Sequence, residues 1–422
     1  MDFEAIEIAA RRKALAVAAR VIECRINADT SDHTGPAMRC SCGELARYAG
    51  RRAKTFQTAL GLMTLERAYY CCDCGKGLFP RDRSLGLQET SLSPSVTRMI
   101  GATAAMVSFE ESSTLLGELA AVHVDAKQVE RTAEALGREI EAHERIPLAG
   151  AAPPAETMYL GLDGTGIPMR QAELEGRAGK QSDGSSKTRE VKLVTVWTAQ
   201  GRDDQGNAVR DPGSITYSAA IESAASSDTD EVSKFAQRVD REAQRRGFDQ
   251  ALRRVALGDG ALWIWNIVAE QFPGTIQIVD LYHAKEHIFE VAKAIYGASS
   301  ELAKQWATQR NDEIDAGDLG KVLDALAAHK NTNQEARKCF DYVTNNRDRM
   351  RYPEFRAQGL SVGSGVVEAG CKVVVGARLK RAGMHWSTAG ANAIIALRCC
   401  KLSGRFEDFW EARSTRMRIA AA

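Results

Sequence analysis

The chain has 422 residues, 44% of them hydrophobic and 26% charged, and this favours a globular protein of two or three domains. No apolar run approaches the roughly 20 residues that span a bilayer, and the amino-terminal segment has no signal-peptide core, so we expect a cytoplasmic protein with no membrane partner. A net charge of +1 argues against a uniformly basic nucleic-acid binder.

The amino-terminal part of the chain carries a cysteine cluster. Residues 1–30 have the irregular apolar stripe of a helix, and residues 31–90 contain five of the ten cysteines. Two cysteine pairs, each followed by glycine, are typical of a zinc ribbon. We assign Zn²⁺ to four of them, with Cys72 competing for the third position; purely structural cysteines or a vestigial site are the alternatives. The assigned ligands are Cys40, Cys42, Cys71 and Cys74.

Basic residues lie within the same block and could grip a DNA backbone. They are Arg47, Arg51, Arg52 and Lys54. Residues 91–145 are helical by pattern, with a short turn near 122–125 and Asp125 placed to cap the last helix. This pattern fits a helix-turn-helix or an ordinary helical bundle. A Pro- and Ala-rich linker, residues 146–156, then marks a domain boundary.

The segment 157–283 alternates strands and helices. Its order of strand, strand, strand, helix, strand, helix, strand is that of an RNase H-like fold, an α/β mixed sheet with helices on its faces. Asp163 falls on the first strand and Asp259 ends the fourth, and each precedes a glycine. In that fold the first and fourth strands are neighbours, so we expect the two carboxylates to meet. A lone Asp-Gly is more often a simple turn.

A third carboxylate follows a helical insertion. Residues 284–350 are strongly helical, and residues 351–422 contain Glu368 about one turn after a Gly-Ser-Gly loop. Clustered acids raise one another's pKa unless cations neutralise them, so Asp163, Asp259 and Glu368 suit a site for Mg²⁺ or Mn²⁺. Two such ions could promote displacement at phosphorus.

An acid and an imidazole stand three residues apart at the end of the fifth strand, Asp280 and His283. They are either a helix cap with a solvent-facing histidine or an accessory pair that binds or positions DNA beside the metals.

Several strings resemble one known family. YLGLDGTGIPM, REVKLVTVW, LGDGALWIWN, VDLYHAKEH, MRYPEFRAQGLSVGSGVVEAGCK and MHWSTAGANAIIALR are similar to the bacterial Kra-type insertion-sequence transposases, and the wider pattern to the DDE transposases of the Mutator-like superfamily. The resemblance runs from about residue 38 to 413. It implies that Asp163, Asp259 and Glu368 form a catalytic metal-binding triad, and that the cysteine block contacts DNA. The crowded run Cys71-Cys72-Asp73-Cys74 departs from the family pattern.

The resemblance implies a transposase that binds the terminal inverted repeats of its element, cuts them by metal-assisted hydrolysis and joins 3′ ends to target DNA, acting as at least a dimer on DNA. From residue 371 onward the sequence has ten Lys/Arg and three Asp/Glu, a local net charge of +7. Such a segment can neutralise phosphates of DNA. Within it we assign DNA contacts to Arg378, Lys380, Arg381 and Trp386, the tryptophan by base stacking. A DNA-binding regulator derived from a transposase, a nuclease that does not join ends, and a purely structural role for these residues are the alternatives.

Overall fold

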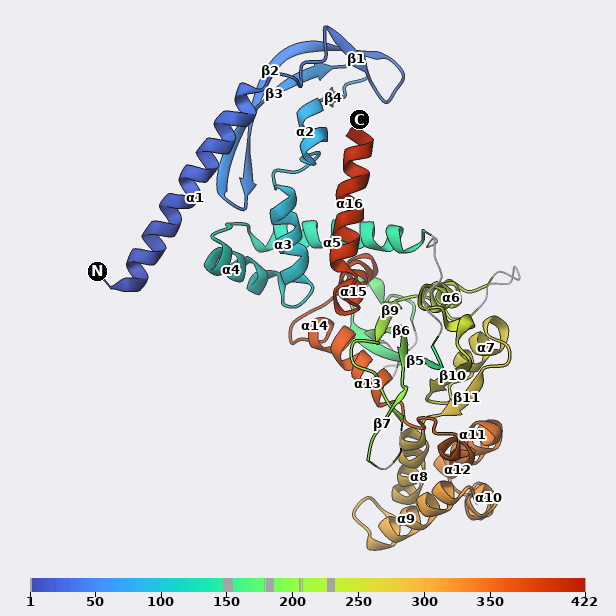
Figure 1. Ribbon diagram of the computed structural model, residues 1–422. Helices are drawn as coiled ribbons and strands as arrows, with labels where there is room; N and C mark the ends of the chain where they lie inside the picture. Colours follow the sequence, from blue (N-terminus) through green and yellow to red (C-terminus); the bar gives the residue numbers. More distant parts are fainter. Residues whose placement is uncertain are drawn as a thin grey trace. The chain divides into compact units, whose positions relative to one another are not determined.

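The computed structural model describes residues 2–146, 155–177, 179, 186–204, 206, 208–225 and 232–421 (Figure 1). The chain divides into two compact units, residues 1–143 with 404–422, and residues 144–403. The expected linker, residues 146–156, falls largely outside the described residues. No helix of the described ranges has the length and apolar character to cross a membrane.

The first unit combines a four-stranded antiparallel sheet with helices. Its elements are α1 (Phe3–Ala28), β1 (Ala37–Arg39), β2 (Leu45–Thr58), β3 (Gly61–Cys71), β4 (Gly77–Leu78), α2 (Pro80–Leu85), α3 (Pro94–Ala104), α4 (Phe109–Ala120), α5 (Ala126–Glu144) and α16 (Phe406–Ala421). The strands follow one another in the order β1-β2-β3-β4. The hairpin between β2 and β3 turns at Gly61, whose φ of 115° suits a residue without a Cβ.

Two features of this unit bear on the sequence predictions. Asp125 does cap α5, because its Oδ1 accepts from the backbone N–H of Gln128 at 2.8 Å. The carboxy-terminal helix α16 belongs to this unit and not with the segment that carries Glu368, because Arg413 pairs with Glu139 of α5 at 2.9 Å. The structure divides residues 351–422, which the sequence prediction grouped together, between the two units at residue 404.

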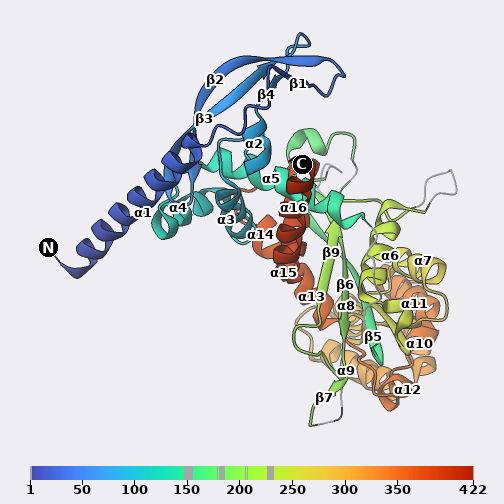
Figure 2. The same cartoon turned by 45° about the horizontal axis from the view of Figure 1, so that its top comes forward.

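The second unit is built on a five-stranded mixed sheet. Its strands are β5 (Thr157–Pro168), β6 (Thr188–Thr198), β9 (Thr216–Ala220), β10 (Arg253–Gly258) and β11 (Ile276–Val279), in the spatial order β11-β10-β5-β6-β9. The chain pairs β5, β6 and β9 antiparallel, then adds β10 and β11 parallel to β5. Figure 2 shows β9, β6 and β5 running side by side. The predicted mixed α/β architecture is confirmed.

The helices and short elements of this unit surround that sheet. They are η1 (Gln171–Glu173), β7 (Gly201–Arg202), β8 (Ala208–Val209), α6 (Lys234–Arg246), η2 (Phe248–Gln250), α7 (Leu262–Gln271), α8 (Leu281–Tyr296), α9 (Glu301–Ala316), α10 (Leu319–Ala327), α11 (Gln334–Asn346), η3 (Arg347–Arg349), α12 (Tyr352–Ala357), α13 (Gly365–Gly370), the π-helical η4 (Cys371–Gly376), α14 (Ala377–Leu379) and α15 (Thr388–Leu402).

Contacts between these elements place them on the sheet. Helix α13 packs against β5 and β6, and α15 against β9. Helices α8 to α12 contact one another as a helical group between β11 and α13 in the chain, where the sequence indicates an insertion. The core of the unit is apolar and continuous, with side chains from the sheet and from this helical group in one cluster. The unit therefore presents Asp163, Asp259 and Glu368 from a single packed framework.

Candidate functional site

Two backbone knuckles of the same kind present four cysteines in the first unit. In the first, Cys40 N–H bonds Glu44 O at 2.8 Å and Gly43 N–H bonds Cys40 O at 3.0 Å. In the second, residues 72–76 repeat the pattern, with bonds of 3.0 and 2.9 Å. The glycines at the turns, Gly43 and Gly75, have φ of 99° and 83°, which explains why each pair needs its glycine.

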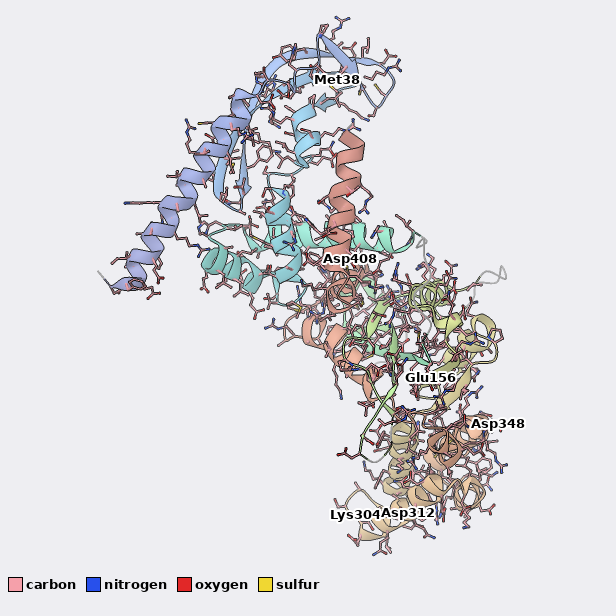
Figure 3. The ribbon with its side chains drawn as sticks, viewed as in Figure 1. Met38, Glu156, Lys304, Asp312, Asp348 and Asp408 are labelled. Atoms are coloured by element: carbon pink, nitrogen blue, oxygen red, sulfur yellow. The ribbon has the colours of Figure 1, made fainter. Side chains whose placement is uncertain are left out.

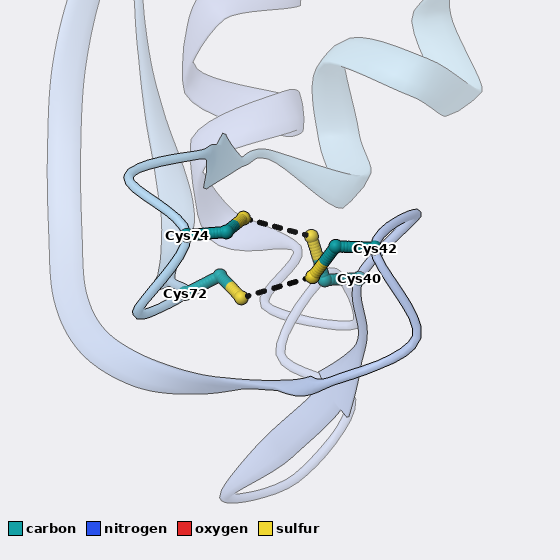
Figure 4. A group of neighbouring side chains, drawn as sticks. All are labelled: Cys40, Cys42, Cys72 and Cys74. Atoms are coloured by element: carbon teal, nitrogen blue, oxygen red, sulfur yellow. Dashed lines mark hydrogen bonds between the residues drawn. The ribbon is translucent and has the colours of Figure 1, made fainter.

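The knuckles bring four thiols together (Figure 4). The group is Cys40, Cys42, Cys72 and Cys74, with all Sγ atoms within 4.8 Å of one another. Sulfur separations of 3.8 Å for Cys40–Cys74 and 3.6 Å for Cys42–Cys72 fit the edges of a tetrahedron around one ion, since Zn–S bonds of about 2.3 Å imply edges of about 3.8 Å. The donor set and spacing therefore fit zinc.

Cys72 replaces Cys71 in the predicted ligand set. Cys71 is the last residue of β3 and is exposed, whereas Cys72 is 2% exposed and faces the other thiols. The signal was available in the sequence, because Cys40-Ser-Cys42-Gly and Cys72-Asp-Cys74-Gly share one spacing. A hydrogen bond from the Cys42 backbone, with help from the neighbouring thiols, lowers the pKa of Cys40 to about 6, which favours the thiolate that a metal binds.

The sheet of the second unit brings two carboxylates together. Leu162 and Gly258 are paired residues of the parallel strands β5 and β10, and Asp163 and Asp259 are the next residue of each chain segment. Paired strands lie about 4.8 Å apart, so Asp163, within β5, and Asp259, just after the end of β10, lie side by side. The Asp259 carboxylate accepts from the Ala261 N–H at 2.9 Å, and Gly260 in between has a φ of 99°.

Glu368 is carried to the same face by α13. Asp163 and Gly161 lie two residues apart on β5 and so share a face of the sheet. On that face α13 lies so close that a Cβ at Gly161 would overlap Cγ2 of Val367. Glu368 is the residue after Val367, and its exposed side chain lies 3.6 Å from the Lys372 ammonium.

The three acids influence one another electrostatically. Burial raises the pKa of Asp163 above its usual value, and the carboxylates of Asp259 and Glu368 raise it further. Hydrogen bonds from the Cys371 thiol and the Gly164 N–H act in the opposite direction, the second at 2.6 Å. At Asp163, burial and the two neighbouring carboxylates therefore outweigh these hydrogen bonds.

Carboxylate oxygens are the ligands that hard cations such as Mg²⁺ prefer. The ligand atoms of the three acids are farther apart than those of the four thiols. In the described part of the chain, only the cysteine group has at least three ligand atoms all within 4.8 Å of one another. Glu368 has half of its side chain exposed, so a rotation of that side chain is the movement a shared cation would need.

A buried aspartate joins the end of β11 to the helix that carries Glu368. Asp280 is 1% exposed; one carboxylate oxygen caps α8 by accepting from His283 N–H at 2.6 Å, and the other accepts from the backbone N–H of Ser364. Ser364 is the residue before α13. Of the two interpretations of this residue, the helix cap agrees with the structure, and a direct contact of Asp280 with DNA does not.

His283 belongs to a ring cluster with His287 and Tyr342, which the sequence did not indicate and which reaches Asp259 through Tyr342. Its imidazole is 4.7 Å from that of His287, which lies 4.5 Å from the ring of Tyr342. The Tyr342 hydroxyl donates to the Asp259 carbonyl at 3.0 Å. Burial, with a contribution from His283, lowers the pKa of His287, so a neutral imidazole is favoured there. Tyr342 comes from the helical group, which therefore buttresses the turn of Asp259.

Two further residues near Asp163 stand out. Cys371, 7% exposed, donates to its carboxylate from the π-helical segment, a kind of distortion that is common at functional sites. Lys380 Nζ bonds Thr165 Oγ1 on β5, two residues beyond Asp163. Lys380 was expected at DNA from the sequence, whereas no sequence signal singled out Cys371.

The residues predicted to contact DNA differ in accessibility. Arg47 and Arg52 are exposed, whereas Arg51 pairs with Asp32 at 3.0 Å and Lys54 bonds Thr90 O at 2.6 Å. Lys380 and Arg381 are exposed as well.

The other two residues predicted to contact DNA, Arg378 and Trp386, are buried. Arg378 is fully buried, and Trp386 is 7% exposed with its indole N–H bonded to Leu379 O at 3.0 Å. Stacking of a base on Trp386 is therefore corrected to an internal contact, with the Arg378 guanidinium 5.3 Å from the indole ring.

Comparisons with known proteins give the following matches. The model of an uncharacterised protein family, UPF0236, matches residues 46–414. No curated protein matches the chain. Among solved structures, the chain is similar to the Drosophila P element transposase strand transfer complex, with 10% identity, 79% of this chain and 84% of that chain covered, and a TM-score of 0.28. At this TM-score the likeness establishes neither a shared fold nor a shared activity.

Proposed function

This chain belongs to the uncharacterised protein family UPF0236, and we propose that it is a DNA transposase of the DDE type, acting on the terminal inverted repeats of its own insertion sequence. The observation that carries the proposal is the convergence of Asp163, Asp259 and Glu368 from two paired strands and one helix. The sequence resemblance to Kra-type and Mutator-like transposases supports it independently.

The core is proposed to be RNase H-like. The support is the strand order β11-β10-β5-β6-β9, with three antiparallel strands first in the chain and two parallel strands added beside the first. This connectivity sets the first and fourth strands side by side, and these are the strands that carry Asp163 and Asp259.

Each residue has a proposed role. Asp163, Asp259 and Glu368 would hold Mg²⁺ or Mn²⁺, which when bound activates the attacking oxygen and stabilises the leaving oxygen at phosphorus. Asp280 holds the α13 end by its bond to Ser364 N–H, so it positions Glu368. The exposed cations Lys380 and Arg381 are placed to contact phosphates near the acids.

The first unit is proposed to recognise DNA. The four-cysteine group would bind Zn²⁺ as a structural ion and fix the two knuckles, while Arg47 and Arg52 remain exposed on the same sheet. The proposed partners are transposon-end DNA and target DNA. Joining two ends requires at least two copies of the chain on DNA, in the bacterial cytoplasm.

The test is a cleavage and joining assay with labelled DNA that carries the inverted repeats flanking the gene. We expect Mg²⁺-dependent nicks at the 3′ ends and joined products from the wild type. Asp259→Asn should bind the DNA and lower both products by about a thousandfold, since ligands of a catalytic metal contribute several kcal/mol to the barrier. The control is Asp249→Asn, an equal charge change at an exposed position paired with Arg254.

The outcomes separate the alternatives. Cleavage without joined products would indicate a nuclease of the same fold. Binding of the repeats without metal-dependent cleavage would reject the transposase and indicate a DNA-binding regulator.

A further inference from the structure

A crevice of about 500 Å³ lies in the second unit, at the end of the parallel strands opposite to the carboxylates. It is lined by the entry to β11, residues 274–277, and by residues of η3 and its flanks, together with Phe355; those of η3 and its flanks are Thr344, Asn345, Arg347, Asp348, Arg349 and Arg351. Asp259 follows the carboxyl end of β10, whereas Gln277 lies near the amino end of β11, which runs parallel to it. The crevice is therefore distinct from the proposed catalytic site.

Positive charge dominates this crevice. Three arginines alternate along the chain and line it: Arg347, Arg349 and Arg351. Asp348 is the one acidic residue among the lining residues; it is labelled in Figure 3. The local excess of two positive charges stands out in a chain with a net charge of +1.

The central arginine is held in place before any ligand arrives. Arg349 Nε donates to Gln277 Oε1 at 2.6 Å, its Nη1 donates to Asn345 O at 3.2 Å, and its guanidinium lies 4.8 Å from the Trp265 ring. Within the described ranges, none of its hydrogen bonds uses Nη2. A guanidinium fixed in this way loses little conformational entropy when it binds an oxyanion.

Burial also lowers the pKa of Arg349, because the charged form gives up hydration that the crevice does not replace. Asp348 offsets part of that effect. An anion in the crevice would supply the missing stabilisation.

The flanking arginines differ in how they are engaged. Arg351 bonds Asp348 O and Glu354 at 3.0 Å each and stays exposed. Arg347 is exposed and makes no side-chain hydrogen bond or ion pair to the described residues. The crevice therefore offers one fixed guanidinium, one exposed guanidinium paired with Glu354, and one exposed guanidinium without a bond to the described residues, a set that suits a tetrahedral oxyanion approached from solvent.

We propose that this crevice binds a phosphate group. The phosphodiester of a nucleic-acid strand and free inorganic phosphate share that chemistry, and the proposal favours the strand because the crevice is open on one side and lies on the unit that carries the carboxylates. It would add affinity for DNA and would contribute nothing to the bond-breaking step.

The experiment measures two ligands on the full chain. Binding of a labelled, sequence-unrelated DNA duplex is followed by fluorescence anisotropy from 50 to 200 mM salt, and binding of inorganic phosphate by calorimetry. The variants are Arg347→Gln, which removes an exposed positive charge, and Arg347→Gln with Arg349→Gln. The control is Arg337→Gln, an equal charge change at an exposed position of α11 outside the crevice.

We expect the slope of log K against log salt to become less negative by about 0.9 for each phosphate that a variant no longer neutralises, in the single and double variants and not in Arg337→Gln. A second outcome is that the variants lose binding of free phosphate but keep the wild-type salt slope for DNA. The crevice would then be a phosphate site, and a nucleic-acid strand would be rejected as its ligand. Wild-type slopes in every variant together with no phosphate binding would overturn the proposal. Asp259→Asn should leave the slope unchanged, which separates this proposal from the catalytic one.

Discussion

The cysteine group and the carboxylate group differ in how completely the protein assembles them. Four thiols stand at sulfur separations of 3.6 and 3.8 Å, held by two backbone knuckles. The three carboxylates come from β5, the end of β10 and α13, and Glu368 turns toward Lys372. A closed set of four ligands is typical of a structural metal, whereas a site that opens to substrate is typical of catalysis.

Charge explains the difference. The lowered pKa of Cys40 favours one thiolate, whereas the pKa values of Cys42 and Cys72 are raised, so the four sulfurs do not all carry charge and the fold can complete their arrangement alone. At the second site, burial raises the pKa of Asp163, and the nearby carboxylates of Asp259 and Glu368 raise it further, so bringing these acids together without a cation is unfavourable. We therefore expect the backbone knuckles to hold the cysteine group in place without a metal, and the carboxylate group to reach its final arrangement only when a cation binds.

The largest expected effect comes from the cysteine group. Cys72→Ser should abolish zinc binding, because a structural zinc in a small module contributes about 10–16 kcal/mol of apparent binding free energy. Cys71→Ser, one residue away, should retain about one zinc per chain. Elemental analysis of both purified variants measures this. Equal zinc content in the two variants would contradict the assigned ligand set.

The next largest effect is expected at Asp280, whose carboxylate links the start of α8 to the residue before α13. Asp280→Ala removes a helix cap and leaves the Ser364 N–H without its acceptor, so we expect a loss of about 2–4 kcal/mol in the free energy of unfolding. The matched control is Asp318→Ala, because Asp318 precedes α10 without a side-chain capping bond. Chemical denaturation should separate the two variants. Equal losses in the free energy of unfolding for the two variants would show that the hydrogen bonds of Asp280 do not stabilise the fold.

Close packing of α13 on the sheet gives a third prediction. Gly161→Ala would place a Cβ in overlap with Val367 and 2.9 Å from Trp197, and should destabilise the fold by about 1–3 kcal/mol while shifting Glu368. At Gly365, in the same helix, an added Cβ meets nothing within 4 Å. Thermal melting of Gly161→Ala and Gly365→Ala tests this, and a neutral Gly161→Ala would count against the packing.

The smallest expected effect is a gain in thermal stability on replacement of Asp163. Because the folded-state pKa of Asp163 is raised, the stability falls as pH rises through that pKa, and Asp163→Asn should remove this cost at neutral pH. Without divalent ions we expect Tm to rise by about 2–4 °C, the change that about 1 kcal/mol produces. Added Mg²⁺ should stabilise only the wild type. A lower Tm for Asp163→Asn at neutral pH would contradict a cost of burying this charged carboxylate beside two others.

Local sequence patterns predicted the parts of each site that depend on one strand or turn. Asp163 and Asp259 each follow an apolar run, and the pairing of those strands brings them together. The glycine after each cysteine pair indicated the knuckles. The choice of Cys72 over Cys71 could also be predicted, because Cys72-Asp-Cys74-Gly repeats the spacing of Cys40-Ser-Cys42-Gly.

Contacts between distant segments could not be predicted. Asp280 and Ser364 are 84 residues apart, and Tyr342 meets Asp259 across 83 residues. The burial of Arg378 and Trp386 also follows from tertiary packing, since both look like surface DNA contacts in a basic segment. A sequence motif gives residue type and spacing, whereas accessibility depends on what the fold places over it.

The most direct test of the central claim is a titration of the chain with Mn²⁺, followed by the loss of the free-ion electron paramagnetic resonance signal. Asp163, Asp259 and Glu368 should form one site, so the wild type should bind Mn²⁺ and each of Asp163→Asn, Asp259→Asn and Glu368→Gln should weaken binding by about 10-fold or more, with Asp249→Asn unchanged. Unchanged Mn²⁺ binding in all three variants, or none in the wild type, would contradict a shared carboxylate metal site.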